Sequence, residues 1–220
     1  MRIGPAAAAS ASTRSRTTMA AAPAASSAPD SHPATLRHPP RRPRGAQGRT
    51  RPPLEHIVSS TLIRPIAPAD DAAVAAIIRT CLEAYRLDIP GTAYFDPELD
   101  HLSRFYASRP GRRAYFVMED ADTARILGGA GLAEYEGLDA CCELQKIYLV
   151  ESERGRGLGR ALLDAVEGHA HKLGYRRVYL ETHTSLHEAV RLYERCGYRR
   201  VDRPATAIHS TMDLFYLKNL

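Results

Sequence analysis

The chain lacks long apolar runs and cysteine motifs. No stretch of 18 apolar residues occurs, so we expect no membrane-spanning helix and no membrane partner. The N-terminal alanines are interrupted by polar residues and proline, which does not suit the core of a secretory signal. The four cysteines include an adjacent pair, Cys141 and Cys142, and none has the C-x-x-C spacing. We therefore expect reduced, buried thiols, no bound metal and a cytoplasmic protein.

The first 62 residues have little apolar bulk and almost no acids. They hold nine arginines, no lysine and the two acids Asp30 and Glu55, which gives a net charge of +7. The whole chain carries +5, so the remainder carries −2 and the basicity belongs to the N-terminal segment. Because so little apolar surface can be buried, residues 1–60 are predicted to be a disordered extension of a folded domain at 61–220.

Three interpretations of this basic extension stay open. It has the composition of an organelle transit peptide, its charge could contact nucleic acid or a membrane, or it is an upstream extension of the true reading frame. We favour a dispensable extension. Nucleic acid is not an expected partner, since the predicted folded part has no basic excess.

Regular apolar periods begin near residue 61. They predict helices that open at Asp70 and Pro97 and at a Ser185–Glu188 capping box, with a longer helix at 158–173. Strands are predicted at 61–66, 114–118, 125–133, 143–150, 177–182, 198–201 and 211–217. The strand, helix and strand across 143–182 form a βαβ unit, so these two strands should be parallel. The order predicts an α+β fold with a single central mixed β-sheet flanked by helices.

A glycine-rich turn joins the strand and helix of that unit. It consists of Arg154, Gly155, Arg156, Gly157, Leu158, Gly159 and Arg160. Backbone N–H groups of such a turn, with those of the helix start, can converge on one anion. The three arginines suit a ligand with several phosphates.

Two common phosphate-binding loops do not fit this turn. A nucleoside-triphosphate loop needs Gly-Lys-Ser/Thr, but Gly159 is followed by Arg160. The dinucleotide fingerprint G-x-G-x-x-G also fails, since Arg160 or Leu162 stands where the last glycine belongs. The pattern R-x-x-G-x-G does fit, at Arg154, Gly157 and Gly159, and it resembles the coenzyme A pyrophosphate loop of the GCN5-related N-acetyltransferase (GNAT) superfamily.

A second motif supports the resemblance. Residues 189–198 resemble the family ending A-x-x-L-Y-x-x-x-G-[FY], and finer similarity at 143–146 and 179–182 suggests a small bacterial-type branch with undefined substrates. Covering about residues 61–220, the resemblance implies the GNAT fold, in which splayed parallel strands bind acetyl-CoA. The strand before the loop fits: strict alternation puts Leu144 and Ile147 on opposite faces, so a β-bulge is predicted at Gln145-Lys146.

The resemblance also implies roles for individual residues. Backbone groups near Ile147, Tyr148 and Leu149 would hold the acetyl group and pantetheine, and residues 154–160 the pyrophosphate. Tyr193 would protonate the coenzyme A sulfur, although it could instead be a core aromatic residue. Leu186 departs from the family pattern, because many members carry there an asparagine that bonds the pantetheine.

The general base is less defined. Glu143 lies eleven residues before Arg154, where some family members carry a glutamate that deprotonates the amine. Partial burial would raise its proton affinity, but a solvated strand-end glutamate fits equally. Glu134, Glu181 and His209 are held in reserve as bases.

The acceptor side is the least informative part of the sequence. Tyr85, Tyr94, Asp96 and His209 are expected to line the acceptor cleft, where Asp96 could attract an ammonium group or only cap the second helix. The acceptor stays open among small amines, amino acids, antibiotics and protein N-termini or lysines.

The resemblance implies an N-acetyltransferase that moves an acetyl group from acetyl-CoA to a primary amine by direct attack in a ternary complex. Two alternatives are a coenzyme A-binding regulatory module without turnover and, less favoured, a nucleic-acid-binding protein that acts through its basic tail. A homodimer is also left open.

Overall fold

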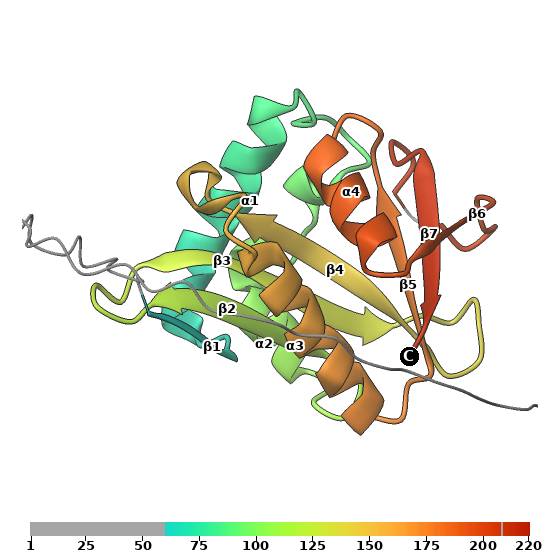
Figure 1. Ribbon diagram of the computed structural model, residues 1–220, viewed down its shortest axis with the longest axis horizontal. Helices are drawn as coiled ribbons and strands as arrows, with labels where there is room; N and C mark the ends of the chain where they lie inside the picture. The colour runs from blue at the N-terminus through green and yellow to red at the C-terminus, as the bar shows by residue number, and fades with distance from the viewer. Residues whose placement is uncertain (1–59, 208) are drawn as a thin grey trace, which may run out of the picture. The chain divides into compact units, whose positions relative to one another are not determined.

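The computed structural model describes residues 60–207 and 209–220, in which one seven-stranded sheet has the order β1-β2-β3-β4-β5-β7-β6 (Figure 1). The strands are β1 (Thr61–Pro65), β2 (Ala114–Asp120), β3 (Ile126–Glu134), β4 (Cys141–Leu149), β5 (Arg177–Thr182), β6 (Arg199–Val201) and β7 (Leu214–Asn219). Only the β4–β5 pair is parallel. The sheet is therefore mixed, and its parallel pair is the predicted one. The predicted N-terminal extension lies outside the described residues, apart from residue 60.

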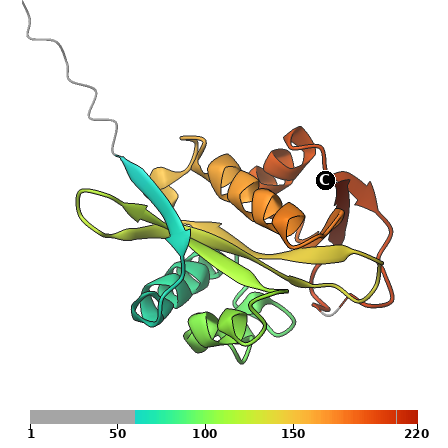
Figure 2. The same ribbon diagram turned by 90° about the horizontal axis from the view of Figure 1, so that it is seen from below.

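Helices cover both faces of this sheet. They are α1 (Asp71–Ala84), α2 (Leu102–Ala107), α3 (Leu158–Lys172) and α4 (His187–Arg195). Figure 2 shows α1 and α2 on one face and α3 and α4 on the other. Two buried clusters match these layers, one with Val74, Ile78 and Leu102, the other with Leu162 and Val166. The predicted α+β class with a single central mixed sheet is thereby confirmed.

The predicted β-bulge in β4 is present. Gly129 pairs with Tyr148 but Gly131 pairs with Gln145, so β4 carries one residue more than β3 over this interval. Lys146 has a left-handed φ of 51°, and the buried Tyr115 donates a 2.9 Å hydrogen bond from its hydroxyl to the Lys146 carbonyl. That bond satisfies a carbonyl that the bulge turns away from the strand ladder.

The glycines of β3 make room for rings beneath the bulge. A Cβ added at Gly129 would lie 2.5 Å from the Tyr115 ring, and one at Gly131 would lie 2.5 Å from Tyr115 and 2.8 Å from Tyr106. Glycine at these two positions thus allows two aromatic side chains to approach the strand closely.

β4 and β5 separate soon after they begin. Their pairing is confined to Cys141–Glu143 on β4 and Arg177–Tyr179 on β5. Beyond this point β4 pairs only with β3, up to Leu149, while β5 continues along β7 to Thr182. The bulge and this early separation open the sheet between its two central strands.

Three predicted element boundaries were wrong. The second helix begins at Leu102, after the 3-10 turn Leu99–His101, rather than at Pro97. The helix α4 begins at His187 without a side-chain cap, so the predicted Ser185–Glu188 capping box is not formed. The last strand begins at Leu214 rather than at Thr211, whose hydroxyl donates to the Pro90 carbonyl at 2.8 Å.

All four cysteines are free and buried, as predicted. Among the described residues, no helix has the length and apolar character needed to cross a membrane.

Candidate active site

A cavity of about 730 Å³ lies where β4 and β5 separate, and we call it the large cavity. Its walls come from the end of β4, the glycine-rich turn, the end of β5 and the helices α1 and α4. Its lining includes Cys81, Tyr85, Arg154, Gly157, Glu188 and Tyr193. An elongated ligand could therefore run from the glycine-rich turn to the gap between the strands.

The glycine-rich turn presents bare backbone to this cavity. Gly155 and Gly157 have φ values of +76° and +82°, which side-chain-bearing residues rarely adopt, and α3 begins directly after Gly157. A Cβ added at either glycine would meet no atom within 4 Å. The amides of residues 155–159 donate no hydrogen bond to other described residues. The turn thus offers free N–H donors at a helix N-terminus, where an anion is favoured.

Arg154 connects the turn to α1. Its guanidinium lies 3.2 Å from the sulfur of Cys81 and 3.4 Å from the hydroxyl of Tyr85. Tyr85 in turn donates a 2.5 Å hydrogen bond to Glu188 of α4. This bond occupies the glutamate of the expected capping box, and the Ser185 backbone N–H, which that glutamate would accept from, donates to His183 instead at 3.2 Å.

Arginines of α4 add positive charge to the large cavity. Arg191 and Arg195 both line it, together with Arg160. Sequence reasoning missed these two residues. The signal was their spacing of four, which places them on one face of the helix.

Tyr193 is almost fully buried, with 4% of its surface exposed, yet it lines the large cavity. Its ring packs near Tyr198 and Tyr216, at centroid distances of 5.8 and 6.2 Å. The hydroxyl makes no hydrogen bond to another described residue, and burial raises its pKa. It is therefore a neutral O–H donor with no acceptor in the described part of the chain.

A second cavity of about 60 Å³, the small pocket, adjoins the large one. Four residues line the small pocket but not the large cavity: Ala93, Glu143, Gln145 and His209. Five residues line both cavities: Leu144, Lys146, Tyr148, Glu181 and Met212. The two spaces thus meet at the bulged part of β4 and the end of β5.

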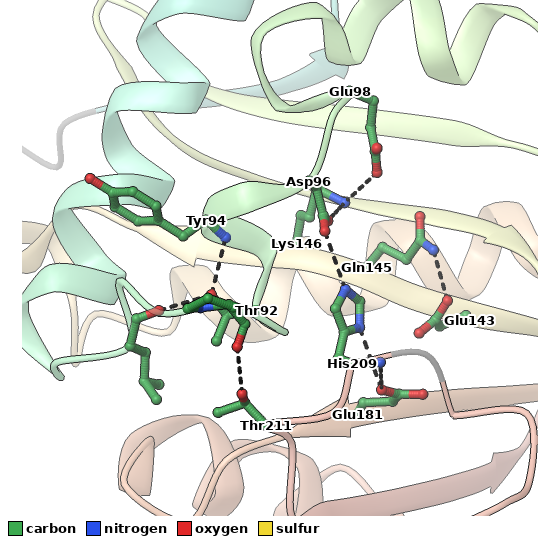
Figure 3. Close-up of polar contacts among 12 residues, drawn as sticks. Thr92, Tyr94, Asp96, Glu98, Glu143, Gln145, Lys146, Glu181, His209 and Thr211 are labelled. Carbon is green, nitrogen blue, oxygen red and sulfur yellow. Dashed lines mark hydrogen bonds and ion pairs between the residues drawn. The ribbon is translucent and has the colours of Figure 1, made fainter.

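Glu143 is buried beside this pocket, with 7% of its surface exposed. Burial raises the pKa of its carboxyl and the nearby Glu181 adds to the rise, while a 2.7 Å hydrogen bond from Gln145 opposes it (Figure 3). The predicted alternative of a solvated strand-end glutamate does not match this burial. A buried carboxylate with raised proton affinity is suited to accepting a proton.

A chain of ion pairs surrounds Glu143. Lys146 lies 2.6 Å from Asp96 and 2.9 Å from Glu98, and His209 lies 3.5 Å from Asp96 and 3.4 Å from Glu181 (Figure 3). Burial alone would lower the pKa of His209, but hydrogen bonds to Asp96 and Glu181 outweigh it and raise the pKa to about 9. Asp96 is therefore an ion-pair partner of both cations and lines neither cavity, so its predicted place in the cleft lining and its predicted role as the cap of the second helix were both wrong.

Glu143, Glu181 and His209 also have the spacing of a metal site. One ligand atom from each lies within 4.8 Å of the others. However, His209 already bonds two carboxylates. The absence of a metal stays a prediction.

The other predicted residues lie in different places. Tyr85 lines the large cavity rather than the small pocket, and Tyr94 lines neither, since its hydroxyl donates to Glu83 at 2.8 Å. The reserve base Glu134 pairs with Arg113 at 2.6 Å, and that hydrogen-bonded pair lowers its pKa to about 2.

Comparison with known proteins gives two kinds of likeness. The model of the "Acetyltransferase (GNAT) family" matches residues 77–198. The chain is also 37% identical over 145 residues to the uncharacterized N-acetyltransferase YjgM of Escherichia coli K12. The aligned residues cover 65% of this chain and 84% of that protein.

Solved structures are similar in fold. A GNAT-family acetyltransferase of Staphylococcus aureus Mu50 superposes with a TM-score of 0.65 at 19% identity, over 73% of this chain and 99% of that one. The yncA protein of Salmonella typhimurium, solved with its cofactor acetyl-CoA, superposes with a TM-score of 0.57 at 21% identity. This superposition covers 73% of this chain and 94% of that one. The fold implied by the sequence motifs is therefore confirmed.

Proposed function

The chain belongs to the acetyltransferase (GNAT) family and is an N-acetyltransferase, and we propose that it transfers an acetyl group from acetyl-CoA to a primary amine by direct attack in a ternary complex. The observation that carries the proposal is the junction of the two cavities. The glycine-rich turn and Tyr193 lie along the large cavity, Glu143 lies in the small pocket, and the two spaces share the bulged part of β4.

The large cavity is assigned to acetyl-CoA. The free amides of residues 155–159 and the guanidinium of Arg154 would bind its pyrophosphate. Backbone groups of Ile147, Tyr148 and Leu149 would hold the acetyl and pantetheine parts, since these residues line the cavity beyond the bulge. Acetyl-CoA bound to yncA, a protein of the same fold, supports this assignment.

The small pocket is assigned to the acceptor amine. Glu143 takes a proton from the amine, whose nitrogen can then attack the thioester carbon. The raised proton affinity of this buried carboxyl suits that role.

Tyr193 is assigned as the proton donor to the leaving group. Its hydroxyl has no protein acceptor among the described residues and can donate its proton to the departing sulfur of coenzyme A. The chain needs no covalent acetyl intermediate, because both substrates can occupy adjoining spaces at once.

Leu186 lines the large cavity where many family members carry an asparagine. It offers an apolar contact to the pantetheine in place of a hydrogen bond, so the amides of the turn and of β4 carry the polar part of binding.

The test is release of free thiol from acetyl-CoA by the full chain, with a panel of primary amines, amino acids and short peptides. We expect turnover on at least one amine and a large loss of kcat in Tyr193→Phe with little change in coenzyme binding. Coenzyme binding without turnover on any acceptor would instead favour a regulatory module. Absence of coenzyme binding would refute the assignment of the large cavity.

A further inference from the structure

The small pocket is surrounded by more negative than positive charge. Two carboxylates, Glu143 and Glu181, and two cations, Lys146 and His209, line it, and the carboxylates of Asp96 and Glu98 pair with these cations to complete a cluster of six charged residues. Even with both cations charged, the cluster has an excess of two carboxylates. A ligand that enters the pocket therefore gains from carrying positive charge.

Neither cation is left to bind an anionic ligand. The ammonium group of Lys146, with 4% of its side chain exposed, is held between Asp96 and Glu98 at 2.6 and 2.9 Å. The ring of His209 lies between Asp96 and Glu181. Its Nε2 is 3.5 Å from the Asp96 carboxylate, and its Nδ1 is 3.4 Å from the Glu181 carboxylate. A ligand carboxylate would have to displace one of these partners.

Glu143 has unused hydrogen-bonding capacity. One of its oxygens accepts from Gln145 at 2.7 Å, but the other makes no hydrogen bond to a described residue. The side chain is more than nine-tenths buried and lines the pocket. This oxygen can accept a hydrogen bond from a ligand, and the N–H groups of an ammonium ion provide a donor.

The size of the pocket limits what can surround the nitrogen. A volume of about 60 Å³ has room for roughly four or five water-sized groups. An amino group and its first methylenes fit that space. A carboxylate on the carbon that bears the amine would bring a third anion beside Glu143 and Glu181, whose side chains are both buried.

We propose that the acceptor is an alkyl primary amine whose amine-bearing carbon carries no carboxylate, and that free α-amino acids are rejected. This inference rests on the proposed function, since it concerns the acceptor of the same reaction. It is carried by the charge excess, the pairing of both cations and the free oxygen of Glu143.

The test compares two acceptors that differ only in the carboxylate, 1-aminopentane and L-norleucine. We expect kcat/KM to be at least about tenfold higher for 1-aminopentane, which corresponds to about 1.4 kcal/mol, because the carboxylate of norleucine is repelled by the buried carboxylates. Norleucine is the less basic of the two, so basicity alone would favour norleucine. Equal values, or a preference for norleucine, would overturn the proposal.

A binding measurement separates this proposal from the proposed function. The melting temperature of the full chain with coenzyme A bound should rise with 1-aminopentane and not with norleucine. If neither amine is acetylated but 1-aminopentane alone raises the melting temperature, the selectivity of the small pocket for an amine without a carboxylate stands, while transfer to this amine fails. If turnover occurs on norleucine alone, the inference fails and the function stands. If neither amine is acetylated or bound, the inference fails, and the proposed function is decided by turnover on the wider panel of acceptors.

Asp96→Asn provides a matched variant, because it removes one charge at almost constant volume. Lys146 and His209 each lose a charged partner, which frees positive charge for a ligand carboxylate. The preference for 1-aminopentane should therefore fall severalfold, with most of the change in the kcat/KM of norleucine. An unchanged ratio would overturn the electrostatic part of the proposal.

Discussion

Tyr115→Phe tests whether the β4 bulge depends on a single buried hydrogen bond. The variant removes the hydroxyl that donates to the Lys146 carbonyl at 2.9 Å and leaves this carbonyl without its partner. Leaving a buried acceptor unpaired costs about 1–3 kcal/mol. For a domain of this size, a loss of about 2 kcal/mol lowers the melting temperature by about 4–8 °C. Urea unfolding followed by circular dichroism gives the change in free energy directly.

A matched control is Tyr175→Phe. The Tyr175 hydroxyl also donates to a backbone carbonyl, that of Arg112 at 3.0 Å, but water can replace it in this exposed contact. We expect that variant to change the free energy of unfolding by about 0.5 kcal/mol or less. If Tyr115→Phe were no more destabilising than Tyr175→Phe, the reasoning that ties the bulge to this bond would be refuted.

Three further predictions concern the proposed site. Arg154→Ala should weaken coenzyme A binding about tenfold to a hundredfold in titration calorimetry, and unchanged affinity would exclude a phosphate contact. Glu143→Gln should lower kcat/KM by about 10²–10⁴-fold. It should also abolish the rise of the rate with pH that comes from deprotonation of the Glu143 carboxyl, whose pKa is raised. A preserved pH profile would point to another base. The folded-state pKa of His209 is about 9, above its ordinary 6.5, so its stabilising contribution is complete below about pH 6.5 and is lost as the pH rises through about 9. The stability difference between wild type and His209→Gln should shrink over this window, and a difference that grew with pH would contradict the ion pairs.

Local features of the fold were predictable because they depend on neighbouring residues. The spacing of Leu144 and Ile147 in the sequence indicated the bulge that Lys146 forms. The glycine pattern indicated the turn and the start of α3 at Leu158. Gly174 and Gly197 end helices with left-handed φ values of +86°, as expected for helix C-termini.

The charged network of the small pocket was not predictable in the same way. Lys146 meets Glu98 from 48 residues away, and no local pattern signals such a contact. Asp96 and Ser185 both resembled helix caps. Asp96 instead pairs with buried cations, while Ser185 bonds His183 and the helix starts beyond it. Capping preferences are worth about 1 kcal/mol, so tertiary partners readily outweigh them.

The central claim is direct transfer from acetyl-CoA to an amine within a ternary complex. The most direct test is the initial rate of thiol release, measured over a matrix of acetyl-CoA and amine concentrations. We expect double-reciprocal lines that intersect, because both substrates must be bound before transfer. Parallel lines, together with an acetylated protein when acetyl-CoA is added alone, would contradict it.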